Sequence, residues 1–479
     1  MRNVNPPLIF QANPTFDVVG KVLLAPMVRI STHPLRLLAL KYGADYVFSE
    51  ELIDQRILRS TRVVNVELNT VDFLLPDGSV TFRTSAEEKK RVVAQLGTAD
   101  AKQGLNAAKM LENDVVAIDV NMGCPKEYSI KGGMGAALLT QPDKVKEILT
   151  CLTTSLRVPV TCKIRILPKL EDTLALAKLI ESTGAAALTV HGRTPSERPR
   201  HRNHDEVIRA ISGTVSIPVI ANGGSRDTIR LFEDIEFFRQ QTGAAGVMVA
   251  RAAMWNPSIF LSPKHGRPPP LLHDVIREFL TLAVRYDLYA TGTKYCIQQM
   301  MHLEGDTPLF LDTVAAKDAE ELCSVWGVSG MYKAEMTRRS NLLNIAHMKR
   351  SACELLHSEL TPKRCRVNGD SNVSGEQNCD AFRMCLPFER RYWPMHGATP
   401  KQLLHEYCNQ RKLKAPEFST IEDRGARLFY STVRLEHKLY ENTSGCKSKK
   451  SSEQAAALVC LEVLGLPNGK CEKKTVSTT

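Results

Sequence analysis

Short apolar runs alternate with stretches of helical periodicity over the first half of the chain. Most of these runs are continuously apolar rather than alternating, which is typical of parallel strands that are covered by helices. The pattern predicts eight strands, at 22–26, 45–50, 92–96, 116–121, 158–164, 186–191, 217–222 and 245–250. Helices are predicted between them at 34–42, 101–112, 142–156, 170–182 and 227–240. Eight strands with seven helical or mixed connections indicate the α/β class and a (β/α)8 TIM barrel over residues 15–262.

One connection, residues 52–90, departs from the helical pattern. Its segment TVDFLLPDGSVTFRT places Pro76-Asp77-Gly78 between two β-rich runs, which predicts a hairpin turn. Such an insertion leaves the strand count of the barrel unchanged.

The pattern changes after Phe260, where the segment SPKHGRPPP interrupts it with prolines. Helical periodicity then predicts a small all-helical domain over residues 271–356. Residues 357–384 are polar and rich in Ser, Asn and Gly, a composition typical of a flexible linker. A helix, a set of strands and an Ala-rich helix follow, and they predict an α+β domain over 385–467 before a polar tail at 468–479.

Composition narrows the class of protein. A hydrophobic content of 43% and a charged content of 24% over 479 residues are ordinary for a soluble globular chain. No apolar run reaches the ~18 residues of a membrane span, and the first residues lack a secretory or transit pattern. The 13 cysteines form no CxxC pair, which argues against zinc or iron–sulfur sites and for reduced thiols. We therefore expect a cytoplasmic protein with no membrane contact, and nothing in the pattern demands more than a monomer.

The chain carries 63 basic and 52 acidic residues, a net charge of +11 that favours polyanionic partners. Residues 385–479 hold 16 basic and 10 acidic residues, so the C-terminal fifth carries over half of this surplus. The uneven distribution indicates a separate binding module, although a charge surplus is often only a solvated surface.

Polar or otherwise special residues follow every predicted strand. In a TIM barrel these positions meet at one mouth, where the active site lies. They are Pro26 with Met27, Glu50, Gln95, Asn121 with Cys124, Lys163 with Arg165, His191 with Arg193, Asn222, and Arg251. Any one of them could be a structural rim residue, but the whole set predicts a single large polar or anionic ligand across the mouth.

The last two strands end in Gly223-Gly224 and Ala250-Arg251, where barrels commonly bind phosphate through backbone N–H groups. Glycines let an anion approach the backbone, and Arg251 can add a charged contact. The alternative is that the glycines only form a tight turn. Lys163 could stabilise negative charge on an electron-rich ring, or it could belong to an ion pair buried in the barrel.

Cys124 lies in a constrained Gly–Cys–Pro turn directly after the fourth strand. Two chemical roles are open to it, nucleophile and proton donor, because a thiol at neutral pH is mostly protonated and can give up its proton. The other cysteines are expected to pack as small hydrophobic residues. The segment KGGMGAALL at 131–139 is a Gly-rich loop that could cradle phosphate or act as a mobile lid.

Taken together, these residues resemble the tRNA-dihydrouridine synthase family. NMGCP and KGGMG are the most specific of the matching motifs. The matching segments are 25–28, 49–54, Gln95, 119–126, 131–139, 162–165, 190–193, 221–224 and 249–257. The resemblance implies an FMN-binding barrel followed by a helical domain, with reduction of a uridine in tRNA to 5,6-dihydrouridine. NADPH or NADH would reduce the flavin.

The resemblance also implies roles for the strand-end residues. Cys124 would be the general acid that protonates carbon 5 of uracil, while the flavin delivers hydride to carbon 6. Asn121, Arg165 and Arg193 would meet the flipped-out uridine or its phosphate. Positions that match FMN contacts are Pro26, Met27, Gln95, Lys163, His191, Asn222, Gly223, Gly224, Ala250 and Arg251.

The C-terminal module opens its Ala-rich helix with a basic cluster, Lys447, Lys449 and Lys450. The segment 448–456 resembles the SKK-x4-AA signature of double-stranded RNA-binding domains, and it predicts phosphate contacts at a helix N-terminus. The usual Gly-Pro-x-His loop is missing, and Glu-Asp-Arg-Gly stands at 422–425 instead. We expect further contacts to tRNA from Arg390, Arg391 and Lys401. The alternative is a charged face on a protein-binding module.

A barrel of this kind with such a domain resembles the eukaryotic class of the family that modifies position 20 in the tRNA D-loop. Two rival hypotheses remain: a small-molecule flavin barrel of the dihydroorotate dehydrogenase kind, and an RNA-binding scaffold with an inactive barrel. The basic C-terminal module argues against the first rival, and the intact Cys124, Lys163 and His191 argue against the second.

Overall fold

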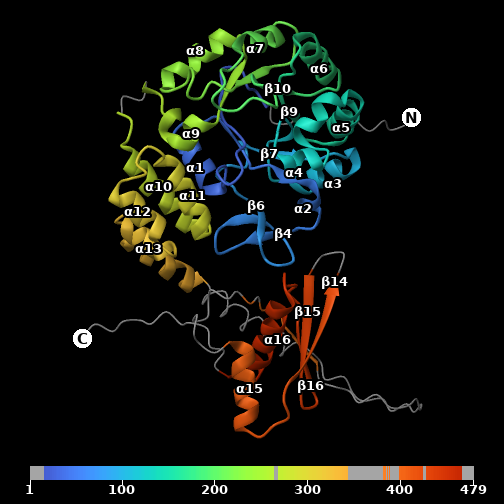
Figure 1. Ribbon diagram of the computed structural model, residues 1–479, viewed down its shortest axis with the longest axis vertical. Coiled ribbons are helices and arrows are strands. Elements are labelled where there is room, and N and C mark those ends of the chain that lie inside the picture. Colours follow the sequence, from blue (N-terminus) through green and yellow to red (C-terminus); the bar gives the residue numbers. More distant parts are fainter. Residues whose placement is uncertain are drawn as a thin grey trace, which may run out of the picture. The chain divides into compact units, whose positions relative to one another are not determined.

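The computed structural model describes residues 16–263, 268–342, 381–384, 386, 388, 399–423 and 428–466 (Figure 1). The chain divides into two compact units, one containing the barrel and the helices after it, the other containing the C-terminal domain. Within the described ranges, no helix is long and apolar enough to cross a bilayer.

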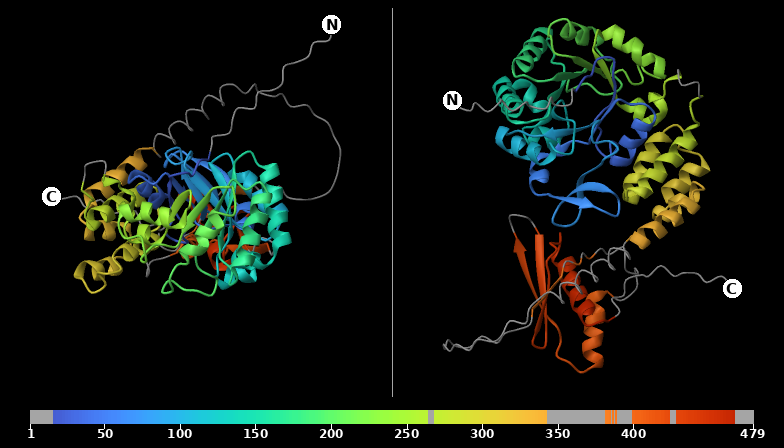
Figure 2. Two further views of the ribbon diagram at one scale, coloured as in Figure 1. Left: turned by 90° about the horizontal axis from the view of Figure 1, so that it is seen from above. Right: turned by 180° about the vertical axis from the view of Figure 1, so that it is seen from behind.

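Eight parallel strands close into a barrel, as predicted (Figures 1 and 2). Each strand pairs with its sequence neighbour in the ring, β12 pairs with β1, and β2 pairs with β7. The strands are β1 (Val22–Leu24), β2 (Tyr46–Phe48), β7 (Val92–Gly97), β8 (Ala117–Met122), β9 (Val160–Arg165), β10 (Ala187–His191), β11 (Val219–Asn222) and β12 (Gly246–Val249). All eight coincide with predicted strands, so the predicted barrel is confirmed.

Helices surround the strands in a ring, and each predicted helix of this part has a counterpart (Figure 2). They are α1 (His33–Lys41), α3 (Ala101–Leu111), α5 (Pro142–Ser155), α6 (Leu170–Ser182), α7 (Asp205–Ser212) and α8 (Phe232–Thr242). The helix α8 begins later than predicted because Asp234 accepts hydrogen bonds from the backbone N–H groups of Arg230 and Leu231, which fixes its start. The short α7 was not predicted.

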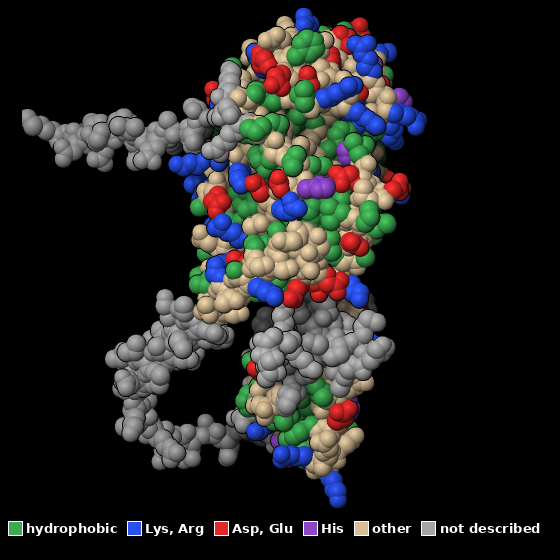
Figure 3. Space-filling view, turned by 90° about the vertical axis from the view of Figure 1, so that its left-hand side faces the viewer, with side chains coloured by type: hydrophobic (Ala, Val, Ile, Leu, Met, Phe, Trp, Pro, Cys, Tyr) green, Lys and Arg blue, Asp and Glu red, His purple; other side chains and the backbone are tan. Residues whose placement is uncertain are grey.

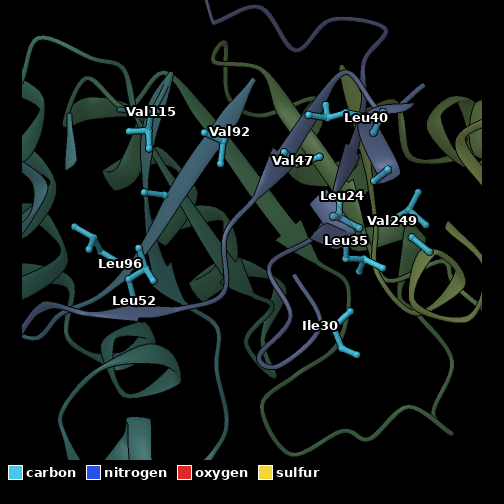
Figure 4. Close-up of a cluster of buried hydrophobic side chains, with 14 of the residues drawn as sticks. Leu24, Ile30, Leu35, Leu40, Val47, Leu52, Val92, Leu96, Val115 and Val249 are labelled. Atoms are coloured by element: carbon cyan, nitrogen blue, oxygen red, sulfur yellow. The ribbon is translucent and has the colours of Figure 1, made fainter. Parts of the chain in front are cut away.

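Alternate side chains of each strand face opposite sides of the barrel wall. Leu24, Val47, Val92 and Leu96 point outward and pack against helices such as α1, which contributes Leu35 (Figure 4). Inward-facing residues form a second apolar cluster that fills the barrel interior, made of Leu23, Ala25, Phe48, Val93, Ala117, Ala187, Ile220 and Met248 with Val18 and Val116. Burial of this apolar surface stabilises the barrel, and the same alternation places the next inward positions at the mouth.

The predicted hairpin is present, with Leu75 N donating to Ser79 O at 2.9 Å and Gly78 at φ +78°. A left-handed φ of this kind suits glycine. Its strands are β5 (Thr70–Leu74) and β6 (Val80–Ser85), and an unpredicted strand β4 (Thr61–Asn65) extends them to a three-stranded sheet. A two-residue strand β3 (Leu52–Ile53) and the short helix α2 (Asp54–Leu58) lead into this insertion.

A buried ion pair joins the insertion to the first helix of the barrel. Arg36 on α1 donates to both carboxylate oxygens of Glu88, from Nε at 2.9 Å and Nη2 at 2.6 Å. Both side chains are almost fully buried. The remaining Arg36 N–H groups donate to the backbone carbonyls of Ser31 and Arg83, so the charge is satisfied on all sides.

The helices that follow the barrel belong to the same compact unit. They are α10 (Leu272–Arg285), α11 (Ala290–Met300), α12 (Pro308–Ala315), α13 (Ala319–Val325) and a helical stretch at 329–342. The helix α10 packs on α1 and buries Val275, Ile276 and Phe279. Lys and Arg side chains are interspersed with Asp and Glu on the face shown in Figure 3.

The C-terminal domain packs two helices on a sheet, as its predicted α+β class requires. Its elements are α15 (Pro400–Gln410), β14 (Glu417–Asp423), β15 (Leu428–Leu435), β16 (Lys438–Asn442) and α16 (Lys449–Val463). Leu404 and Cys408 of α15 pack with Val459 of α16 and Val433 of β15 in one core.

One strand of this domain was not predicted. Residues Ala381–Met384, at the end of the predicted linker, form β13, which pairs in parallel with β16. The rest of the linker at 357–380, together with the tail at 468–479, lies outside the described residues.

Replacing Glu88 by alanine should lower the free energy of unfolding by about 3–5 kcal/mol, because it leaves Arg36 buried without its counter-charge. Denaturant unfolding followed by tryptophan fluorescence measures the loss. The matched control is Glu236→Ala, since Glu236 pairs with Arg239 on the solvent-exposed part of α8 and its loss should cost no more than about 1 kcal/mol. Equal losses in the two variants would contradict a stabilising role for the buried pair.

Candidate active site

A pocket of about 220 Å³ opens at the C-terminal ends of the barrel strands. Nine residues predicted from the strand ends line it: Pro26, Gln95, Asn121, Cys124, Lys163, Arg165, His191, Asn222 and Ala250. The structure therefore brings together side chains from seven strands and the loops that follow them. Ala25, Val28, Glu51, Gly123 and Pro125 complete the lining and were not predicted.

Cys124 is held by a tightly bonded turn. The side-chain oxygen of Asn121 accepts hydrogen bonds from the backbone N–H groups of Gly123 at 3.0 Å and Cys124 at 3.1 Å. The Cys124 carbonyl in turn accepts from Ala136 N at 2.9 Å. A side chain at Gly135, which has φ +59°, would come within 2.7 Å of that carbonyl oxygen, so glycine is required there. The Gly-rich segment thus packs beneath the Cys124 turn.

The wall beside this turn, formed by the neighbouring strand β9 and by β10, is strongly positive. Burial, together with repulsion from Arg165, lowers the pKa of Lys163 to about 8. Burial also lowers the pKa of Arg165 to about 10, with Arg193 as the next cause. The pKa of His191 falls well below its usual value because of burial and the neighbouring cations, so this imidazole is neutral at pH 7. A wall of this kind attracts an anion or the electron-rich edge of a ring.

A hydrogen-bonded rung lies at the base of the pocket, where Gln95 also lines it. Gln95 on β7 and Thr161 on β9 both donate to Asp119 on β8, at 2.8 Å and 2.7 Å. The three residues are direct cross-strand partners and are nearly inaccessible to solvent. Because Asp119 binds the amide nitrogen of Gln95, the amide oxygen is the atom left for a ligand. Burial raises the pKa of Asp119 to about 6, against these hydrogen bonds and the charge of Lys163.

Glycines and arginines shape the loops after the last two strands. Gly223 has φ +120°, and a side chain there would collide with Asn203, so only glycine fits. Arg251 begins α9 (Arg251–Trp255) and donates to the Ser225 carbonyl at 3.3 Å. Gly224 is buried against Phe238. These residues border the pocket without lining it.

Two other predicted residues also lie outside the lining. Met27 is half-buried and packs against both hydrophobic clusters of the barrel. Arg193 is 1% exposed and donates to the carbonyl of Gly223 at 2.9 Å, while it also pairs with Asp227. It therefore supports the Gly223 loop from behind.

Glu51 is the charged pocket residue that the sequence analysis missed. Asn121, Ser129 and Cys124 direct polar side-chain groups at its carboxylate, while burial raises its pKa. Its buried Oε1 has no hydrogen-bond partner among the described residues. Its neighbour Glu50 accepts instead from the Arg29 backbone N–H. The matching segment at 49–54 contains both Glu50 and Glu51, but the sequence alone did not indicate which of the two carboxylates faces the pocket.

The predicted RNA-contacting residues of the C-terminal domain differ in exposure and in pairing, and some lie outside the described residues. Lys447, Lys449 and Lys450 are exposed at the start of α16, where Ser448 caps the helix by accepting from Ser451 N at 3.2 Å. Lys401 pairs with Glu453 at 2.6 Å and also lies over the ring of Phe418. Arg390 and Arg391 lie outside the described residues, as do residues 424–427 of the loop with the missing motif.

Comparison with known proteins identifies both parts of the chain. The family model described as Dihydrouridine synthase (Dus) matches residues 23–303, and the Double-stranded RNA binding motif matches residues 400–464. The chain belongs to the dihydrouridine synthase family, and the predicted resemblance is confirmed.

Curated relatives carry corresponding names. The chain is 39% identical over 293 residues to tRNA-dihydrouridine(20) synthase [NAD(P)+] of Schizosaccharomyces pombe, across 59% of this chain and 60% of that protein. It is 34% identical to the protein of the same name from Saccharomyces cerevisiae, across 64% of this chain and 83% of that protein. The chain thus spans less than two thirds of the fission yeast relative. A solved structure described as a tRNA-dihydrouridine(20) synthase dsRBD domain is 42% identical, over 19% of this chain and 96% of its own, with a TM-score of 0.19.

The Asp119 carboxyl should make stability depend on pH. Its folded pKa of about 6 lies above the unfolded value of about 3.9, so the folded state holds this proton more tightly. The resulting stability is fully present only below the unfolded pKa and is lost as the pH rises through 6, with about 1 kcal/mol lost between pH 5 and pH 7. The difference in melting temperature between wild type and Asp119→Asn should therefore fall by roughly 2–4 °C from pH 5 to pH 7.

Thr161→Val is the control for this measurement, because it removes a hydrogen bond to Asp119 without removing the titrating group. It should keep a pH-dependent stability but shift the transition to higher pH, because the lost hydrogen bond no longer opposes the effect of burial on the pKa of Asp119. A difference between wild type and Asp119→Asn that does not change with pH would show that the carboxyl does not titrate in this range.

Proposed function

We propose that this chain is a flavin-dependent tRNA-dihydrouridine synthase that reduces a uridine of the tRNA D-loop, at position 20. The observation that carries the proposal is the position of the Cys124 turn, which faces the same pocket as the cationic wall of Lys163 and Arg165. Family membership and the names of the yeast relatives support the reaction and the position. The cytoplasm is the compartment we propose.

FMN is the cofactor that the pocket residues fit. Lys163 and the neutral His191 can contact the polar edge of the ring system, and Gln95 presents an acceptor oxygen to a ring N–H. Asn222, Gly223, Gly224, Ala250 and Arg251 offer backbone N–H groups and positive charge for the phosphate. Pro26, which lines the pocket, and Met27, which follows it after β1, would contact the ring. Bound FMN, once reduced by NADPH or NADH, supplies hydride to carbon 6 of uracil.

The chain itself supplies the proton. The Cys124 thiol donates to carbon 5 as hydride reaches carbon 6, so that one proton and one hydride are added across the double bond. The turn that Asn121 holds fixes the sulfur relative to the base, and positioning of this kind lowers the entropic part of the barrier. Arg165, which lines the pocket, would contact the uracil or its phosphate. Solvent returns a proton to the thiol after each turnover.

The C-terminal domain holds the tRNA. A base can reach the pocket only when it leaves its stack, so the enzyme must grip the RNA elsewhere while the nucleotide is extruded. The start of α16 combines a helix N-terminus with Lys449 and Lys450, two features that favour phosphate. The match to the double-stranded RNA binding motif supports this role.

Purified protein should show flavin absorbance that bleaches with NADPH and recovers on addition of unmodified tRNA, but not of free uridine or orotate. Cys124→Ala should still bind flavin and be bleached by NADPH, yet form dihydrouridine at least about 100-fold more slowly, because general acids contribute about 10²–10⁴-fold. Stopped-flow absorbance and mass spectrometry of the tRNA measure the two steps.

Cys151→Ala is the matched control, since Cys151 is a half-buried thiol on α5 that donates to the backbone carbonyl of Ala101 and does not line the pocket. It should retain wild-type turnover. Normal turnover by Cys124→Ala would remove this thiol from the mechanism, and a colourless protein that still bound tRNA would leave an RNA-binding scaffold.

Replacing Lys449 and Lys450 together by alanine should weaken tRNA binding several-fold and flatten its salt dependence. Each lost phosphate contact reduces the slope of log K against log salt by about 0.7–0.9. Fluorescence anisotropy with labelled tRNA at several salt concentrations measures both quantities. The control pair is Lys412→Ala with Lys414→Ala, two exposed lysines after α15, which should change neither. An unchanged slope in the first pair would place the phosphate contacts elsewhere.

A further inference from the structure

The loop between β10 and α7, residues 194–204, exposes three arginines that form no ion pair within the described residues. Arg198, Arg200 and Arg202 are all solvent-exposed. Throughout the described structure, no carboxylate lies within ion-pair distance of any of the three. Unpaired arginines at this density form a local concentration of positive charge that can bind an anion without first breaking an internal ion pair.

The loop uses its only acidic residue internally. Glu197 accepts hydrogen bonds from Thr194 N at 2.6 Å and pairs with His204 at 2.9 Å, which closes the loop on itself. That pairing raises the pKa of His204, chiefly through the hydrogen bond to Glu197. The carboxylate is therefore unavailable to the arginines.

Further bonds fix the loop in one conformation. Arg198 N donates to His201 Nδ1 at 2.8 Å, and the His201 carbonyl accepts from Arg193 Nε at 2.7 Å. Pro195 and Pro199 restrict the backbone further, because each ring fixes φ. A loop that is already ordered loses little conformational entropy when a ligand binds.

The loop is continuous with the wall of the pocket. Arg165, which lines the pocket, donates from Nη1 to the Thr194 carbonyl at 3.0 Å. Arg198 is close enough to contribute to the lowered pKa of Arg165, after burial and the nearer Arg193. Positive charge is therefore present both in the pocket wall and in the adjoining exposed loop, with the Glu197 carboxylate, paired to His204, beside it.

We propose that Arg198, Arg200 and Arg202 bind the RNA phosphates that flank the uridine in the pocket. The inference rests on the proposed function and adds a second RNA contact, on the barrel itself. A nucleotide extruded from its stack carries a phosphate on each side, and both must lie at the rim when the base is inside. We define residues 194–204 as the arginine loop.

The position of the arginine loop favours RNA rather than NADPH as its ligand. The 2′-phosphate of NADPH lies at the end of the dinucleotide far from its nicotinamide, whereas the phosphates of a flipped nucleotide lie beside its base. The arginine loop adjoins Arg165 in the pocket wall, and the phosphates of a flipped nucleotide would lie there. Contacts to the RNA backbone do not depend on the RNA sequence. Exposed arginines suit such contacts because they bind phosphate charges rather than base edges.

The triple variant R198Q/R200Q/R202Q tests the proposal by anisotropy with unmodified tRNA across salt concentrations. Affinity near 0.1 M salt should fall on the order of tenfold or more, and the slope of log K against log salt should decrease by about 2. Flavin content and the rate of flavin reduction by NADPH should match those of the wild type.

The matched control is K89Q/K90Q/R91Q, which removes the same charge from three exposed residues just before β7, at the opposite end of the barrel. Its tRNA affinity should stay within about twofold of the wild type. Equal losses in both triple variants would show only an effect of net charge, and would overturn the proposal.

Two further outcomes would also overturn it. One is unchanged tRNA binding by R198Q/R200Q/R202Q. The other is slower flavin reduction with NADPH but not with NADH, together with normal tRNA binding, which would assign the arginines to the 2′-phosphate. Dihydrouridine assays on the wild type keep the two claims separate. If the wild type forms dihydrouridine, an unaffected arginine variant refutes the loop contact alone; if it forms none, the proposed function fails.

Discussion

The register of the parallel strands is the constraint on which the site depends. Because side chains alternate between the two faces of a strand, positions two apart share the barrel interior. Gln95 lies opposite Asp119, and Asp119 lies opposite Thr161. One layer higher, Asn121 lies opposite Lys163. A slip of one residue between any pair would turn its polar members toward the helices and its apolar members toward the ligand, so packing of the helix-facing residues fixes the site.

Burial sets the electrostatic character of the pocket. Asp119 is the acidic group beneath Lys163, and its own raised pKa shows that the interior stabilises its negative charge poorly. The interior also stabilises the positive charges of Lys163 and Arg165 poorly, since burial lowers the pKa of each. Positive groups outnumber negative ones on this wall, and the imbalance can be relieved by an anionic or electron-rich ligand. The exposed arginine loop continues this charge to the rim.

The turn at Cys124 shows how few atoms define a reactive position. One side-chain oxygen, that of Asn121, orders two successive N–H groups, and Gly135 lets the following chain approach closely. Backbone geometry thus positions the thiol, which is also directed at the carboxylate of Glu51 on a distant element. Glu51 lies beside it with a buried oxygen that has no partner in the described structure, a feature that only the packed pocket reveals.

Local patterns in the sequence were enough to predict the eight barrel strands, their order and most of the pocket lining, because continuous apolar runs and the residues that end them are local properties. The family motifs and the Lys-rich start of α16 could also be recognised from the sequence alone. Tertiary structure alone decided which strand-end residues reach the pocket. Arg193 turned behind the wall to hold Gly223, and Glu51 rather than Glu50 faced inward. It also ordered the 194–204 loop and added β13 to the C-terminal sheet. These outcomes depend on contacts between residues far apart in the chain, and spacing along a sequence carries no information about which partner satisfies a buried charge.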